Sequence, residues 1–257
     1  MMKSSLRSVV GAAVFHIGLL LSIPVWGVPS LATGLLPFRQ RYWFITRWCG
    51  WILWWLWVCC GVRVRVEGLE NIPPDGAVVA AKHQSAWETF ALEQWFHPQS
   101  WVIKRQLLHL PFFGWCLKLL EPIAIDRGAG REAVKQIVTQ GGDRLERGRY
   151  VVVFPEGTRV PAGYRGRYRI GGAILACETG FPIVPVAHNA GEIWPRRSFR
   201  IHPGTIHVRI LPAVLSANRE PDELMGAVAG AIEAAMPDVS QCGYSGEPRE
   251  SERKGRA

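Results

Sequence analysis

The stretch YVVVFPEGTR, residues 150–159, combines a candidate buried strand with a turn suited to holding a ligand. Tyr150 to Phe154 are all β-branched or aromatic, which is typical of a strand with both faces covered. Gly157 follows the carboxyl end of that strand, where a residue without Cβ lets the backbone approach a bound group closely. Arg159 offers a bidentate fork to a phosphate. A plain turn without a ligand is the alternative.

Further short apolar runs predict strands, and segments with helical patterns alternate with them. The expected strands are residues 77–81, 101–103, 122–125, 183–187 and 205–211. The expected helices begin near residue 85 or span residues 131–147, 172–179 and 222–235. This alternation indicates an α/β fold with a mixed, largely parallel sheet flanked by helices, which we assign to residues 67–240. Residues 241–257 end in a polar run and are expected to be disordered.

The positive charge of the chain is concentrated at its amino-terminal end. The formal net charge is +9, and the first 66 residues contain seven Lys or Arg and no Asp or Glu. Seven of the twelve tryptophans lie in the same stretch and frame long apolar blocks. Tryptophan and arginine beside apolar runs favour the headgroup layer of a bilayer, whereas nucleic-acid binding requires them interleaved on a polar surface. The composition therefore indicates a membrane partner and argues against nucleic acid.

Residues 1–66 are expected to form a membrane-embedded or interfacial apolar helical hairpin. Two apolar blocks, residues 8–36 and 48–62, are separated by a basic stretch. The second block is shorter than the roughly 20 residues that cross a bilayer as a helix. Pro24 and Pro29 are expected to break the first. A cleaved signal peptide is the alternative, although the first block is longer than a usual signal sequence.

A candidate catalytic pair lies in KHQSAWET, residues 82–89. His83 and Glu88 are five positions apart, which places them on opposite faces of a strand and about 140° apart on a helix. They meet only if the chain turns between them, as it does where a loop enters a helix. The imidazole could then remove a hydroxyl proton while the carboxylate orients it. The alternative is a capping box with Ser85 at the N-cap and Glu88 at N3, and the two interpretations are compatible.

Three other segments carry cations suited to phosphate. KRQLLHLPFFGW begins with Lys104, IDR ends a strand at Arg127, and GYRGRYRIGG, residues 163–172, contains three arginines. For the last segment we expect an anionic headgroup or a cofactor phosphate as partner. A solvated helix end and a surface salt bridge are the alternatives for the first two.

Neither a metal site nor a resident cofactor is expected. The six cysteines show no C-x-x-C pair, and the seven histidines form no H-E-x-x-H motif. Thiols without a regular spacing are typical of a reduced protein that faces the cytosol.

In this order, the blocks resemble the glycerolipid acyltransferase family. KHQSAWET resembles the first block of the family, KRQLLHLPFFGW with PIAIDR the second, FPEGTR the third and IVPVA the fourth. The resemblance covers most of the chain, up to about residue 189. It implies transfer of a fatty acyl group from acyl-CoA or acyl carrier protein, as co-substrate, to the free hydroxyl of lysophosphatidic acid. The expected product is phosphatidic acid, made at the cytoplasmic face of a bacterial inner membrane.

The resemblance also implies a role for each matched residue. His83 would act as general base, and Glu88 would hold its imidazole in the correct tautomer. Pro185 would border the acyl or thioester side. The residues implied in substrate binding are Lys104, Arg127, Glu156, Gly157, Thr158 and Arg159.

Two residues depart from the usual first block. Glu88 stands where aspartate is usual, so the geometry must absorb one extra methylene. Lys82 stands where asparagine is common, and a cation beside His83 would lower the pKa of its imidazole unless Lys82 points elsewhere. Another lysolipid acceptor, such as a lyso-ornithine lipid or a lysophospholipid, and a non-catalytic lipid-binding protein remain as alternative functions.

Overall fold

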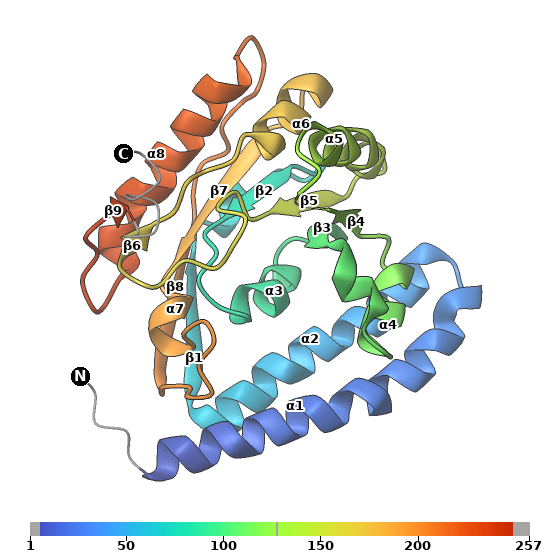
Figure 1. Ribbon diagram of the computed structural model, residues 1–257, viewed down its shortest axis with the longest axis vertical. Coiled ribbons are helices and arrows are strands. Elements are labelled where there is room, and N and C mark those ends of the chain that lie inside the picture. Colours follow the sequence, from blue (N-terminus) through green and yellow to red (C-terminus); the bar gives the residue numbers. More distant parts are fainter. Residues whose placement is uncertain (1–5, 127, 249–257) are drawn as a thin grey trace.

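The computed structural model describes residues 6–126 and 128–248, which form a sheet with helices on both faces (Figure 1). The longer helices are α1 (Leu6–Ala32), α2 (Phe38–Cys60), α5 (Arg131–Glu146), α6 (Gly171–Thr179) and α8 (Pro221–Val239). The short helices are α3 (Trp87–Ala91), α4 (Phe113–Leu119) and α7 (Ala190–Ile193), with 3-10 turns η1 (Thr33–Leu35), η2 (Leu69–Asn71), η3 (Leu92–Gln94) and η4 (Arg105–His109). The strands are β1 (Val62–Glu67), β2 (Val78–Ala81), β3 (Gln99–Lys104), β4 (Ile123–Ile125), β5 (Tyr150–Val153), β6 (Tyr164–Arg165), β7 (Ile183–His188), β8 (Gly204–Ile210) and β9 (Glu247–Pro248).

The main sheet has seven strands in the order β1-β8-β7-β2-β5-β3-β4. Strands β7, β2, β5, β3 and β4 pair in parallel, β8 is antiparallel to β7, and β1 pairs in parallel with β8. The predicted mixed, largely parallel sheet flanked by helices is therefore confirmed. Because parallel strands end at the same edge of a sheet, the segments that follow β2, β5, β3 and β4 gather at one edge.

The central strands bury side chains on both faces of the sheet. In β2, Val79 and Ala81 contribute to one apolar core, and Val78 and Ala80 contribute to the other. This alternation follows from the two-residue period of a strand. The first core lies against α2 and α3, and the second lies against α5, α6 and α8 (Figure 1). Burial on both faces explains why these strands are continuously apolar in sequence.

The helices α1 and α2 form the expected hairpin, and this hairpin is part of the fold. The two helices run antiparallel and side by side along one face of the molecule (Figure 1). Ile52 and Leu56 of α2 are buried in the same core as the inner face of β2, and Phe15 of α1 packs into it as well. The hairpin therefore covers one face of the sheet in addition to any contact with a membrane.

The two prolines of α1 do not break it, contrary to the sequence-based expectation. A proline in a helix leaves the carbonyl four residues earlier without its N–H partner, which here affects Leu20 and Val25. The side chains of both residues are on the outer face, 66% and 73% exposed. The lost hydrogen bonds thus fall away from the packed side of the hairpin, and the helix continues through Pro24 and Pro29.

An apolar stripe follows the outer face of α1. Its exposed side chains recur every three or four residues and are Val10, Val14, Ile17, Leu21, Val25 and Val28. Within the described residues, Ser8–Leu35 is long and apolar enough to cross a membrane, and 11% of its most apolar window is buried. A core helix of a soluble protein would be mostly buried, so packing within this chain does not account for the stripe.

The hairpin ends at residue 60, earlier than the predicted boundary at residue 66. Gly61 closes α2 in the left-handed conformation, and β1 then pairs with β8 from Val62 opposite Gly204 to Glu67 opposite Arg209. The α/β domain therefore begins at residue 62. The alternation in VRVRVE, residues 62–67, is itself typical of a strand, but most of this segment falls within the predicted hairpin because of its arginines.

The carboxyl-terminal segment is ordered further than expected. Residues 249–257 of the predicted disordered tail lie outside the described residues. Residues 241–248 are mostly exposed but are held by contacts: β9 pairs with β6, and Tyr244 donates its hydroxyl to Glu233 of α8. The prediction is wrong for these residues because backbone pairing and one tyrosine hold a segment whose composition is polar.

A buried acid joins the hairpin to the α/β domain. Tyr42 of α2 donates its hydroxyl to Glu93 of η3 and accepts the N–H of Gln99, the first residue of β3, at 2.7 Å. Burial raises the pKa of Glu93 to about 8, although hydrogen bonds from Tyr42, Gln99 and Thr46 oppose the shift. Glu93 consequently holds a proton in the folded protein at neutral pH.

This acid predicts a pH-dependent stability. In the unfolded chain Glu93 loses its proton near pH 4.5, whereas in the folded protein it keeps the proton up to about pH 8. The free energy of unfolding should therefore fall between these two values, by at most about 1.4 kcal/mol per pH unit from this group. Glu93→Gln should flatten that slope in denaturant unfolding of the detergent-solubilised protein. Equal slopes for the variant and the wild type would contradict the assignment.

Candidate active site

The segment after β2 carries His83 at the edge where the parallel strands end. Its imidazole stacks on Phe154, which follows β5, with ring centroids 4.2 Å apart and planes 19° from parallel. Only 8% of His83 is exposed. The neighbouring strands β2 and β5 therefore bring together two segments that are about 70 residues apart in sequence.

Glu88 meets His83 because the chain turns between them. The distance from His83 Nδ1 to Glu88 Oε1 is 2.8 Å, and the backbone N–H groups of Gln84 and Ser85 donate to the same carboxylate oxygen at 2.9 and 2.8 Å. Ser85 Oγ accepts the N–H of Trp87 at 3.2 Å. The N-cap of α3 is Ala86, one residue after Ser85, and it makes no side-chain cap hydrogen bond, so the predicted capping box is not formed in that register. Glu88 still accepts the Ser85 N–H at the helix start while it contacts His83, as the predicted His–Glu pair requires.

The electrostatics of the pair set the tautomer of His83. Burial alone would raise the pKa of Glu88, but the hydrogen bond with His83, the nearby His188 and the Ser85 N–H outweigh it, and the net shift lowers the pKa. Glu88 is therefore ionised at neutral pH. An ionised carboxylate only accepts hydrogen bonds, so Nδ1 of the neutral imidazole carries the proton and Nε2 presents a free lone pair. This is the tautomer that a general base requires.

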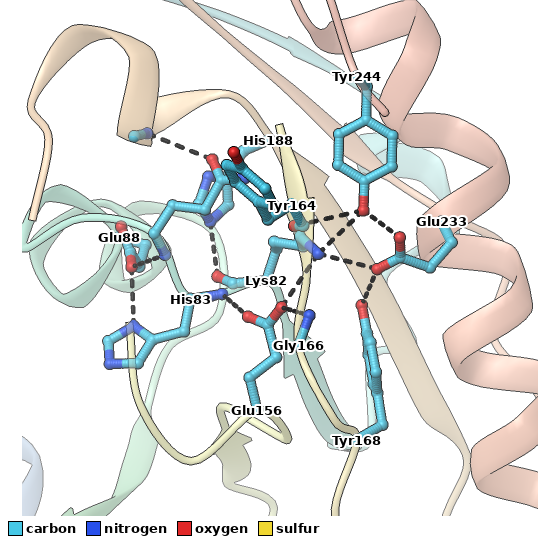
Figure 2. Close-up of polar contacts among 12 residues, drawn as sticks. Lys82, His83, Glu88, Glu156, Tyr164, Gly166, Tyr168, His188, Glu233 and Tyr244 are labelled. Atoms are coloured by element: carbon cyan, nitrogen blue, oxygen red, sulfur yellow. Dashed lines mark hydrogen bonds and ion pairs between the residues drawn. The ribbon is translucent and has the colours of Figure 1, made fainter. Parts of the chain in front are cut away.

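The turn after β5 holds the backbone of His83 from both sides. Glu156 Oε2 accepts the N–H of His83 at 2.7 Å, and Val160 donates its N–H to the carbonyl of His83, also at 2.7 Å. Glu156 is buried, and its Oε1 accepts the N–H of Gly166 at 3.3 Å (Figure 2). Both carboxylate oxygens have donors from the protein, so Glu156 shapes the turn and is not available to a substrate in this arrangement.

Lys82 points away from the imidazole. Its ammonium is completely buried, 3.0 Å from Glu156 Oε1 and 2.8 Å from Glu233 Oε1, and lies near the rings of Tyr168 and Tyr244 (Figure 2). Successive residues of an extended chain point to opposite sides, which separates Lys82 from the side chain of His83. Lys82 therefore points elsewhere, and two carboxylates neutralise its charge on the other side of the backbone from the imidazole.

Gly157 and Thr158 occupy the tip of the turn. Gly157 has a φ of +68°, and a Cβ there would lie 2.8 Å from Nε of Arg169. Only glycine combines that backbone conformation with so close a neighbour. Thr158 is exposed and Arg159 is partly exposed, and within the described residues the guanidinium of Arg159 has no hydrogen bond or ion pair. Arg159 thus keeps its donors available for an anion.

Comparison with known proteins identifies the family of this chain. A model of the acyltransferase family matches residues 63–189. The 1-acyl-sn-glycerol-3-phosphate acyltransferase of Pseudomonas aeruginosa is 47% identical to this chain over 81% of its length and 82% of the relative. This chain belongs to the 1-acyl-sn-glycerol-3-phosphate acyltransferase family.

Proteins of lower sequence identity also match most of the chain. The 1-acyl-sn-glycerol-3-phosphate acyltransferase of Saccharomyces cerevisiae is 30% identical over 72% of this chain and 62% of the relative. The crystal structure of the 1-acyl-sn-glycerophosphate (LPA) acyltransferase from Thermotoga maritima superposes with a TM-score of 0.75 at 22% identity, covering 89% of this chain and 94% of that one. That likeness shows a shared fold.

The remaining residues for which the resemblance implied a role are Lys104, Arg127 and Pro185. Lys104 ends β3 and is exposed at the same sheet edge as His83. Arg127 lies outside the described residues. Pro185 is buried inside β7, opposite Ala80 of β2, so the expected contact with the acyl or thioester side of the substrate is not supported.

Sequence reasoning missed three residues of this region. Glu233 and Tyr244 complete the cluster around Lys82, but nothing in their local sequence links them to residue 82. Arg169 lies against Gly157 and belongs to the basic aromatic segment, which was noted only as a group. The buried lysine was the available signal, because a buried ammonium requires carboxylate partners from elsewhere in the chain.

Lys82 predicts a large effect on stability. Lys82→Met would leave Glu156 and Glu233 buried without their cation and should lower the free energy of unfolding by about 3 kcal/mol. Arg209→Gln is the matched control, because it removes an ion pair with Asp238 that is exposed and should cost less than about 1 kcal/mol. Denaturant unfolding compares the two variants. A loss for Lys82→Met no larger than the control would contradict the role of the cluster.

Proposed function

We propose that the protein transfers a fatty acyl group to the free hydroxyl of lysophosphatidic acid and so forms phosphatidic acid. The observation that carries the proposal is the contact of 2.8 Å between His83 Nδ1 and the ionised Glu88, at the sheet edge that also holds the FPEGTR turn. Relatives that share this family are named for the same reaction. The donor is acyl-CoA or acyl carrier protein, used as co-substrate, and no resident cofactor takes part.

The chemistry follows from the tautomer of His83. Nε2 takes the proton of the acceptor hydroxyl while the hydroxyl oxygen attacks the thioester carbonyl of the donor. The carbon–sulfur bond then breaks, and the leaving thiolate takes the proton back from the imidazolium. Glu88 stabilises the imidazolium between these two steps. The acyl group passes directly to the acceptor, without an acyl-enzyme.

The phosphate of the acceptor is assigned to Arg159, with Lys104 as a second cation. Both lie at the carboxyl edge of the parallel strands, where ligands of such sheets bind. Arg159 has a free guanidinium in the described structure, and the glycine before Thr158 leaves the turn open to a close approach. Arg127 is included in this proposal from its place after β4. A panel of lysolipid acceptors distinguishes lysophosphatidic acid from lyso-ornithine lipid and other lysophospholipids.

Substitution of the His–Glu pair tests the mechanism. His83→Ala should lower kcat/KM with lysophosphatidic acid and acyl-CoA by about 10³-fold, within the range that general bases contribute. Glu88→Ala should also be severely impaired, whereas Glu88→Asp should retain activity because it keeps the carboxylate. Thermal unfolding of each variant provides the control. Full turnover by His83→Ala would exclude the general base, and a Glu88→Ala variant that loses stability alone would leave Glu88 as a cap.

We also propose that the apolar stripe of α1 lies in the membrane interface. The stripe runs along the hairpin that covers one face of the sheet, and α2 adds exposed Trp43, Trp54 and Trp57. Arg47 stacks on Trp43 at 4.6 Å, as expected where a guanidinium lies beside an apolar phase. An interfacial helix lets lipid acceptor and product move between bilayer and site. The cytoplasmic face of a bacterial inner membrane is the proposed location.

Membrane association can be measured by sedimentation with vesicles of phosphatidylethanolamine and phosphatidylglycerol. Ile17→Ser, Leu21→Ser and Val25→Ser combined should weaken binding at least about 100-fold, because each exposed aliphatic side chain contributes roughly 1.5 kcal/mol or more when buried. Leu215→Ser is the control, since that side chain is 68% exposed but lies outside the hairpin. Unchanged sedimentation of the triple variant would rule out the stripe as the contact surface.

A further inference from the structure

A large cavity lies between the segment Arg165–Ile170 and α8. It has a volume of about 1000 Å³ and also borders Glu156, Thr158 and the end of the carboxyl-terminal segment near Pro248. A single phosphate fills a small fraction of such a space, which is at the upper end of the range for sites of drug-sized ligands. The cavity, here called the arginine pocket, therefore has room for a ligand much larger than the acceptor phosphate.

The lining of the arginine pocket is basic. Arg165, Arg167 and Arg169 are exposed on it, and within the described residues their guanidinium groups have no ion pair or hydrogen bond. Of the two acids on the lining, Glu156 is paired with Lys82, which leaves Asp222. Unpaired guanidinium groups repel one another, and their planar forks match phosphate oxygens. Charge and shape together indicate a ligand with several phosphate groups.

The backbone that carries these arginines is held in place before any ligand binds. Gly166 donates its N–H to Glu156, and Tyr168 donates its hydroxyl to Glu233 at 2.7 Å (Figure 2). Arg169 donates its N–H to the carbonyl of Pro155 at 2.8 Å. At the start of the segment, β6 pairs with β9. A segment anchored at this many points loses little conformational freedom on binding, which is the condition for a preorganised site.

The same carboxylate connects the pocket to the proposed catalytic base. One oxygen of Glu156 accepts the N–H of Gly166 in the arginine segment, and the other accepts the N–H of His83. The pocket wall and the base are thus bridged by one buried side chain. The pocket also borders Thr158, which belongs to the same turn as Phe154, the residue that stacks on His83.

We propose that the arginine pocket binds the phosphate groups of the acyl donor. The inference rests on the proposed function, which requires an acyl donor. In that donor the thioester is attached to a phosphorylated pantetheine arm. Both acyl-CoA and acyl carrier protein carry such an arm, and acyl-CoA adds the further phosphate groups that the three arginines could match. The acceptor phosphate is already assigned to Arg159 and Lys104. Arg165 and Arg167 are the residues to test, because Arg169 lies against Gly157 of the FPEGTR turn.

The first test measures binding without turnover. Titration calorimetry with coenzyme A should show binding to the wild type and at least about tenfold weaker binding to Arg165→Gln/Arg167→Gln, since charge-assisted hydrogen bonds to phosphate are lost. Arg197→Gln/Arg200→Gln is the matched control, because it removes two exposed arginines elsewhere and should bind as the wild type does. Equal affinity of the pocket variant and the wild type would overturn the proposal.

The second test separates donor from acceptor. In Arg165→Gln/Arg167→Gln the KM for acyl-CoA should rise about tenfold, while the KM for lysophosphatidic acid stays within about twofold of the wild type. Parallel assays with acyl carrier protein show whether the pocket serves that donor too. A rise confined to the acceptor KM would assign the pocket to the acceptor and overturn the proposal. A wild type that binds coenzyme A but does not acylate lysophosphatidic acid would count against the proposed function alone.

Discussion

The site depends on the buried carboxylate of Glu156, which pairs with Lys82 and accepts the N–H of His83. It is buried, and it is balanced by the buried ammonium of Lys82, which lies 3.0 Å away and also reaches Glu233. Charges without water are costly unless they are paired and fully hydrogen-bonded, and this cluster meets both conditions. Because Glu156 accepts the N–H of His83, the position of the imidazole depends on a network that extends to α8 and Tyr244. Residues far from the reacting atoms thereby become part of the site.

The parallel sheet explains how separate motifs form one site. The strands β2, β5, β3 and β4 all end at the same edge, so the segments that follow them lie close together although they are far apart in sequence. His83 stacks on Phe154 for this reason, and Lys104 lies at the same edge. At the start of α3, the backbone N–H groups of Gln84 and Ser85 hold the carboxylate of Glu88 against His83. Glu88 thus accepts backbone N–H groups at the helix start and contacts His83 with the same carboxylate.

The amino-terminal hairpin has two apolar faces with different partners. Its inner face buries Phe15, Ile52 and Leu56 in the core of the sheet, and Tyr42 fixes it to Glu93. Its outer face exposes the stripe of α1. A helix that is apolar on both sides has no face suited to water, which is consistent with a position between a folded domain and a lipid surface. The same helices therefore stabilise the fold and face the environment in which lipid substrates are found.

The sequence by itself determined the α/β class, most strands and helices, the hairpin and the His83–Glu88 pair, because these follow from local periodicity and from motifs a few residues long. It did not place β1 or the segment at residues 241–248, and it left open whether Lys82 points toward His83 or elsewhere. Those features depend on partners distant in the chain: β8 for β1, β6 for β9, and Glu156 with Glu233 for Lys82. Only the tertiary structure decided them, since strand pairing and the compensation of a buried charge are properties of residues that meet in space.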